Sequence, residues 1–207
     1  ERYAALAEEM AAKENDPARK AELLSMAAAC RHVPRNPARS FREAVQSIWL
    51  VFVPLMIEGW GAGMSLGRVD QYLLPYYRAD LASGAITRAE AQELASLLLI
   101  KLNAAINLQE GFLSVAFSGY PVMQGLTVGG LTPDGRDAVN ELTYLFLDAE
   151  EDVGLTAEDV VVRISRYNPE KFVIRACEVA RNLHGKLKFV SDDTTIDSLL
   201  QMGTPLE

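Results

Sequence analysis

The sequence is poor in the residues that build metal centres, disulfide frameworks and nucleic-acid surfaces. Its 207 residues include two cysteines and two histidines, and Cys30 and Cys177 are too far apart for a Cys-x-x-Cys site. The formal net charge is −8, whereas nucleic acids and anionic membranes bind clustered Lys and Arg. These shortages argue against a metal site, a disulfide scaffold, and a nucleic-acid or membrane partner. They favour a reducing, cytoplasmic location.

Long apolar runs and nucleotide-binding motifs are also missing. The most apolar stretch, 48–57, is far shorter than the roughly 20 residues of a membrane-spanning helix, and we interpret it as part of a buried helix. Gly129 and Gly130 follow a short apolar run, but the G-x-G-x-x-G pattern and the Lys-Ser/Thr of a phosphate loop are absent. No Ser-His-Asp arrangement is evident either. The local motifs therefore predict a scaffold without a catalyst of its own.

What the first half does contain is helix signals. Residues 1–31 have the pattern of two helices broken at an Asp-Pro pair. Ser40 with Glu43, and Thr87 with Glu90, have the spacing of capping boxes, in which side chain and backbone satisfy each other at a helix start. We expect a long helix after each box, with a glycine-rich loop between them.

The second half alternates short β-branched runs with helical patterns. Such alternation is typical of parallel strands joined by crossover helices, and apolar parallel strands are covered on both faces or closed into a barrel. The expected strands are 126–130, 159–165 and 187–191, and the expected helices are 136–152, 168–185 and 194–203. A turn at 132–135 follows the first strand, and Asn168 is the expected cap of the second helix.

The carboxyl ends of these strands carry most of the polar residues of this half. Residues 129–130, 163–166 and 191–193 should meet at one edge of the sheet, where α/β proteins place their ligands. Asp192 and Asp193 are favoured as residues that offset the positive end of a helix dipole. An acid–base pair or a cation ligand is the open alternative.

Several strings, in this order, resemble the glycyl radical enzymes, the family of pyruvate formate-lyase. The resemblance covers essentially the whole chain, and it implies an α/β fold in which these residues form a partial barrel, about half of it. It further implies that 1–207 is an internal segment of a single domain, with 1–110 mainly helical and 111–207 alternating. The strings are ACRHVPRNPARSFREAVQSIW, SLGRVDQYLLPYYRADLASGAITRAEAQEL, GYPVMQGLTVGG, DGRDAVNELTYLFLDA, VVVRIS and PEKFVIRACEVARNLHG.

The resemblance also implies a function. In its full-length form the protein would be a lyase (a dehydratase, a C–N or C–S lyase, or a decarboxylase) that acts on a small organic substrate by thiyl-initiated hydrogen abstraction. Its cofactor would be a glycyl radical installed by a radical S-adenosylmethionine activating enzyme, with no metal or nucleotide in this chain, and it would form a homodimer. The catalytic cysteine and the radical glycine would lie outside 1–207. The alternatives are a carbon–carbon bond-forming enzyme of the fumarate-adding or formate acetyltransferase type, and a non-catalytic truncated subunit.

The resemblance suggests substrate-lining residues as well. In relatives, the segment that matches 119–124 runs along the inner wall of the barrel, so Tyr120, Met123 and Gln124 would line the chamber. Met123 stands where relatives present an aromatic ring, and a flexible thioether there implies a different pocket shape. Ser65 lies in a second lining segment and could hydrogen-bond a polar group of the substrate. Core filling for Met123 and a purely structural Ser65 are the competing interpretations.

Overall fold

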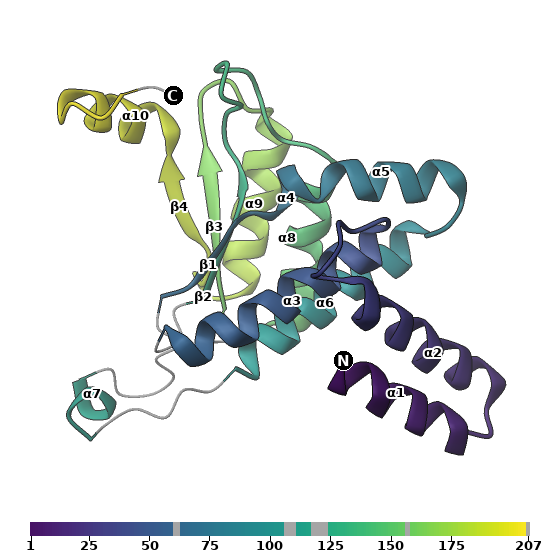
Figure 1. The fold of residues 1–207 in the computed structure, drawn as a ribbon. Coiled ribbons are helices and arrows are strands. Elements are labelled where there is room, and N and C mark those ends of the chain that lie inside the picture. Colours follow the sequence, from purple (N-terminus) through teal and green to yellow (C-terminus); the bar gives the residue numbers. More distant parts are fainter. Residues whose placement is uncertain (60–62, 106–110, 117–123, 156–157, 206–207) are drawn as a thin grey trace.

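The computed structural model describes residues 1–59, 63–105, 111–116, 124–155 and 158–205. Helices dominate the first half of the described chain, and strands alternate with helices in the second (Figure 1). The helices are α1 Arg2–Lys13, α2 Pro17–His32, α3 Phe41–Glu58, α4 Val69–Tyr72, α5 Leu74–Ser83, α6 Arg88–Asn103, α7 Gly111–Ala116, α8 Glu141–Val153, α9 Glu170–Asn182 and α10 Asp192–Gln201. The strands are β1 Ser65–Arg68, β2 Gln124–Gly129, β3 Glu158–Ile164 and β4 Lys188–Ser191.

The four strands form one parallel sheet in the order β1-β2-β3-β4. Each connection is a crossover that carries helices, because two neighbouring parallel strands cannot be joined by a tight turn. The three strands expected in the second half are confirmed, and they lie side by side in the expected order.

Strand β1 was not expected, because residues 65–68 fall inside the predicted glycine-rich loop. The strand has only four residues, and Gly67 adopts a positive φ of 69° within it. Its register against β2 shifts between Ser65 and Arg68. So short and irregular a strand has no alternating pattern for sequence reasoning to detect.

One face of the sheet packs into the core. Leu126, Val128, Val160 and Val162 are almost completely buried, and α6, α8 and α9 contribute to the same hydrophobic cluster (Figure 1). The residues between them in the strands point to the other face, because strand side chains alternate. That face, described below, keeps partial exposure in the described residues, so covering on both faces is not seen.

Two helix starts differ from expectation. The helix expected at 136 begins five residues later, because the side chain of Asn140 caps α8 by accepting from the N–H groups of Leu142 and Thr143. Asn168 does not cap α9. Its side-chain oxygen accepts instead from the N–H of Ser165, and its amide nitrogen donates to the carbonyl of Gly130.

The capping boxes are confirmed in one case and half-formed in the other. Thr87 and Glu90 exchange both bonds. Ser40 accepts from the N–H of Glu43, but the carboxylate of Glu43 accepts from Arg39 rather than reaching back to Ser40.

The last part of α3 is less buried than the sequence indicates. Val51, Leu55 and Ile57 are 43, 49 and 74% exposed, although the run was interpreted as part of a buried helix. Cys177, whose helical spacing with Val173, Ile174 and Ala180 predicts a core position, is exposed instead. No helix in the described ranges is long and apolar enough to cross a membrane.

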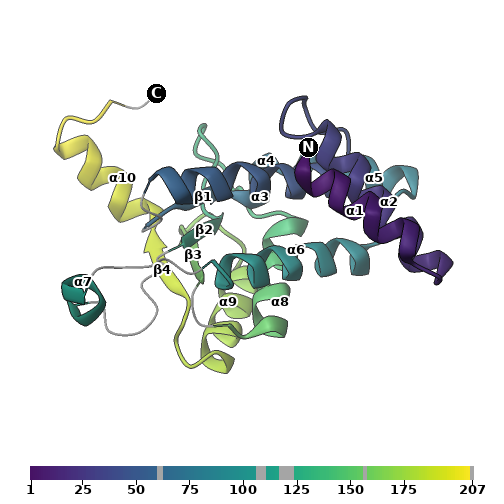
Figure 2. The ribbon, with the colours of Figure 1, turned by 60° about the horizontal axis from the view of Figure 1, so that its bottom comes forward.

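The N-terminal hairpin and α10 lie outside the central unit. α1 packs on α2 through buried alanines, and the pair meets the rest of the described chain mainly through α2 against α3 (Figure 2). At the other end, α10 extends away from the sheet beyond β4 in both views.

Candidate functional site

Ser65 lies on β1 directly opposite Gly125 of β2. A Cβ added at Gly125 would lie 3.8 Å from Ser65 Oγ. The Ser65 hydroxyl therefore lies on the partly exposed face of the sheet, which we call the open face, beside the space that Gly125 leaves by having no side chain. Ser65 Oγ accepts a hydrogen bond from the N–H of Gly67 at 3.2 Å. Because one lone pair is used in that bond, the hydroxyl proton can be donated outward to an acceptor.

The open face continues across the sheet from Ser65. In register, Thr127 lies opposite Val161 and Val161 opposite Lys188. Thr127 and Val161 are half-buried, and Lys188 is exposed and paired with Asp159. The face therefore offers hydroxyls and a small apolar area, with this lysine already neutralised.

The carboxyl ends of the strands meet as expected, but they bond to one another. The carboxylate of Asp192 accepts from the N–H of Leu131 at 2.7 Å and from Arg163 Nε and Nη2 at 2.6 and 2.9 Å. Asp193 accepts from Ser165 Oγ and from the N–H of Arg166. Both aspartates lie in the first turn of α10, so their expected position at a helix start is confirmed. These bonds tie β2, β3 and β4 together at this edge.

A second group of bonds closes the same edge at β1. Arg68 donates to the carbonyls of Leu131 and Gly129 at 2.8 and 2.7 Å. Asp70 is completely buried and accepts from the N–H of Gly129 at 2.8 Å and from Thr143 Oγ1 at 2.6 Å. Burial raises the pKa of Asp70, although these hydrogen bonds oppose the shift. The polar groups at the carboxyl edge are used in hydrogen bonds within the protein. The open face is therefore the better candidate for a ligand site.

The other predicted lining residues are described only in part. Tyr120 and Met123 lie outside the described residues. Gln124 is the first residue of β2, where its backbone lies opposite Glu158. Of the predicted lining residues, Gln124 is thus the one that the structure describes near Ser65, since it precedes Gly125, the residue that pairs with Ser65.

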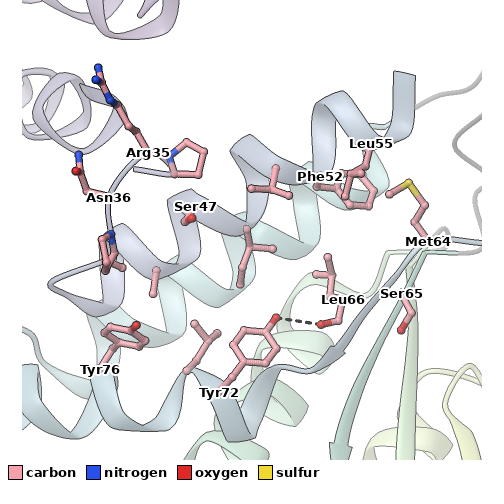
Figure 3. A pocket seen from close by; sticks show the side chains of 17 residues that line it. Arg35, Asn36, Ser47, Phe52, Leu55, Met64, Ser65, Leu66, Tyr72 and Tyr76 are labelled. Carbon is pink, nitrogen blue, oxygen red and sulfur yellow. Dashed lines mark hydrogen bonds between the residues drawn. The ribbon is translucent and has the colours of Figure 1, made fainter. Parts of the chain in front are cut away.

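A separate hollow of about 620 Å³ lies on the other side of β1. It is bounded by α3, by the loop after α2, and by α4 and α5; Leu66 and Tyr72 point into it, whereas the Ser65 hydroxyl points away (Figure 3). Tyr72 donates to the carbonyl of Leu66 at 3.1 Å, and burial raises the pKa of Tyr72 to about 12. The hollow could not be predicted from the sequence, because its walls come from five separate parts of the chain, including β1.

Two further features of the described ranges concern Cys30 and the possible metal ligands. Burial raises the pKa of the Cys30 thiol, which disfavours the reactive thiolate. No group of three or more Cys, His, Asp or Glu side chains in those ranges is arranged to hold a metal ion.

Comparison with known proteins identifies the class of fold. The chain is similar to a solved structure that describes 1,2-propanediol dehydration in Roseburia inulinivorans. The TM-score is 0.95, and the identity is 40% over 99% of this chain and 24% of that one. It is also similar to the B12-independent glycerol dehydratase of Clostridium butyricum, with a TM-score of 0.94 and 38% identity over 100% of this chain and 26% of that one. These residues thus form one piece of the α/β barrel of a glycyl radical enzyme.

The family follows from the sequence match. The pyruvate formate lyase-like family model matches residues 1–207, and the chain belongs to that family. An isethionate sulfite-lyase of Nitratidesulfovibrio vulgaris is 41% identical over 98% of this chain and 25% of its own length. The trans-4-hydroxy-L-proline dehydratase of Clostridioides difficile is 34% identical over 100% of this chain and 26% of its own length. The chain thus spans about a quarter of the length of these relatives.

Proposed function

We propose that these residues form part of the chamber wall of a glycyl radical lyase, which removes a leaving group from a small organic substrate after hydrogen abstraction by a thiyl radical. Two observations support this proposal. The names of the compared relatives describe the elimination of sulfite or water, and the sheet has one packed face and one open face. A wall of this kind suits radical chemistry, because a carbon radical must be kept from water and from stray hydrogen donors.

The catalytic cysteine and the radical glycine belong, in this proposal, to parts of the polypeptide outside residues 1–207. The radical is installed there by a radical S-adenosylmethionine activating enzyme, and the active protein is a cytoplasmic homodimer. This division of labour fits a chain in which the polar groups at the strand ends bond to one another rather than facing a substrate.

Ser65 is the substrate-binding residue that the geometry supports best. Its hydroxyl accepts from Gly67 and keeps its proton available on the open face, next to the space left by Gly125. A substrate hydroxyl or an anionic oxygen can accept that proton. Tyr120, Met123 and Gln124 continue the same wall in this proposal, because the segment that holds them leads directly into β2.

The test uses the full-length protein, activated without oxygen by its activating enzyme. The substrates are isethionate, trans-4-hydroxyproline, propane-1,2-diol and glycerol, with product release as the readout and the glycyl radical measured by electron paramagnetic resonance. Release of product from one of them supports the lyase. A normal radical yield with no product from any of the four would contradict this set of substrates, and bond formation to an added fumarate would contradict the lyase itself.

The role of Ser65 is tested separately. Ser65→Ala should lower kcat/KM about 10- to 100-fold, the value of one hydrogen bond to a buried polar group, without changing the radical yield. Ser65→Thr keeps a hydroxyl and is the matched control. Unchanged kcat/KM in Ser65→Ala would reject the role of Ser65 but not the lyase.

The two alternative functions receive no specific support. The relatives compared above are a sulfite-lyase and dehydratases, which does not favour a carbon–carbon bond-forming enzyme. No observation on the described residues favours a non-catalytic subunit.

A further inference from the structure

A second surface, separate from the open face of the sheet, combines apolar side chains with positive charge. Two adjoining hollows of about 230 and 300 Å³ lie between the α1–α2 hairpin and helices α3 and α6. Together they form one groove, which we call the hairpin groove, because both are lined by the same five side chains: Arg19, Met26, Gln46, Trp49 and Lys101. Figure 2 shows the hairpin standing apart from α6, with α3 as the link.

Each wall of the hairpin groove is one stripe of a helix. The wall from α1 is Tyr3, Leu6 and Met10, which have i, i+3, i+7 spacing and are 62, 52 and 47% exposed. The wall from α6 runs from Leu94 to Lys101 with the same spacing and includes Leu97, which is 49% exposed. Stripes of two turns are about 10 Å long. Their length and spacing match the face that one further amphipathic helix would present.

The charge of the groove is opposite to that of the chain. The described residues that line the two hollows include Arg19, Arg42 and Lys101 and no Asp or Glu, although the whole chain carries a net charge of −8. Arg19 pairs with Glu22 of the same helix, and Glu22 lines neither hollow. Lys101 lies over the indole of Trp49, with Nζ 5.8 Å from the ring centroid.

We infer that the hairpin groove is a docking site for an acidic amphipathic helix that comes from outside residues 1–207. Its apolar stripe fills the space between α1 and α6, and carboxylates beside that stripe meet Arg42 and Lys101. The volumes of the hollows fit the side chains of one helix face rather than a whole helix, so the partner lies across the groove and remains solvated on its outer side. A small amphiphile would use the same chemistry, but it would leave the stripe on α1 exposed.

The test follows Trp49 fluorescence, since Trp49 lines both hollows. The 207-residue chain carries Trp60→Phe so that Trp49 is its remaining tryptophan. The probe is a helical peptide of about 14 residues, or four turns, with leucines at i, i+3, i+4 and i+7 flanked by glutamates. A second peptide has lysine in place of each glutamate, and laurate represents a small amphiphile.

We expect the glutamate peptide to change the Trp49 emission and to bind at least tenfold more tightly than the lysine peptide. The double variant Arg42→Glu/Lys101→Glu should weaken the glutamate peptide at least tenfold and strengthen the lysine peptide. Arg35→Glu/Lys171→Glu is the matched control, because it makes the same charge change at exposed residues outside the groove and should have little effect. Circular dichroism confirms that all variants are folded.

Three results would overturn the inference. Equal binding of both peptides would mean adsorption to an apolar surface without charge recognition. An equal loss in the control variant would mean a response to net charge alone. Binding of laurate without binding of the glutamate peptide would assign the groove to a small amphiphile. None of these results bears on the lyase, because no activity is measured.

Discussion

The two faces of the parallel sheet are made by alternate residues of the same strands, yet they are used differently. On the packed face, Val160 and Val162 are completely buried against helices. On the open face, Val161 is half-buried and lies in line with Thr127 and Lys188. The packed face holds the chain together, whereas the open face is the one that the proposed function assigns to the substrate. If that proposal holds, adjacent residues of one strand serve stability and recognition separately.

The carboxyl edge belongs with the packed face in this comparison. Its glycines, arginines and aspartates look like a ligand site in the sequence, but Asp192 accepts hydrogen bonds from both Arg163 and the backbone N–H of Leu131. Substitutions there should affect folding, and substitutions on the open face should affect activity. The following predictions test that division, all by urea unfolding of the 207-residue chain.

The largest effect is expected for Gly130→Ala. Gly130 has a φ of +79°, and an added Cβ would lie 2.5 Å from Asp192 Oδ2 and 2.8 Å from Arg163 Cβ. The unfavourable φ and the overlap together should cost about 3 kcal/mol or more of unfolding free energy. Gly135→Ala is the control, since Gly135 has a similar φ of +77° but nothing within 4 Å. Equal losses in the two variants would show that the edge is not tightly packed.

Asp192→Ala should come next. Asp192 is 2% exposed and is bonded to both Arg163 and the backbone, so its removal leaves a partly buried arginine without its partner. We expect a loss of about 3 kcal/mol. Asp134→Ala, which breaks an exposed pair with Arg136, should change little. An unfolding free energy of Asp192→Ala close to that of the wild type would mean that this edge does not hold the fold, and its polar groups would again be candidate ligand contacts.

The two valines compared above give the most direct test of the faces. Val162→Ala removes two buried carbon atoms and leaves a cavity, so we expect a loss of about 2 kcal/mol. Val161→Ala, one residue away on the open face, should cost about 0.5 kcal/mol because that side chain already meets solvent. A reversed order of the two losses would mean that the open face is covered.

The smallest effect concerns pH. Burial raises the pKa of Asp70 in the folded protein, so the folded state takes up a proton at a higher pH than the unfolded state does. The folded state is therefore stabilised as pH falls through the raised pKa, and this gain is lost as pH rises. Relative to Asp70→Asn, the wild type should gain stability between pH 7 and pH 4. A difference that does not vary with pH would show that Asp70 keeps its ordinary pKa.

Local signals in the sequence predicted the fold well where one short motif decides the structure. The Thr87–Glu90 box begins α6, as its spacing predicts. The β-branched run before Ser165 forms β3. Local signals predicted the structure wrongly where a residue distant in the sequence determines it. Asn168 has a side chain suited to a helix cap, but its amide nitrogen donates instead to the carbonyl of Gly130.

The candidate site was less accessible to sequence reasoning. Resemblance to a family pointed to Ser65, but the strand that holds it has no pattern of its own, and its neighbour Gly125 is far away in the chain. The hairpin groove could not be foreseen either, because helix stripes that look like ordinary core positions define it only when four helices are placed together.

The bond from Asp192 to Leu131 also has a consequence for synthesis. The aspartate follows its backbone partner by 61 residues. During synthesis on the ribosome, the segment 129–131 at the end of β2 therefore emerges long before Asp192, the residue that holds it in place. The segment can be fixed only when α10 has emerged. Nascent chains that stall before residue 192 should therefore be cut by proteases at the end of β2.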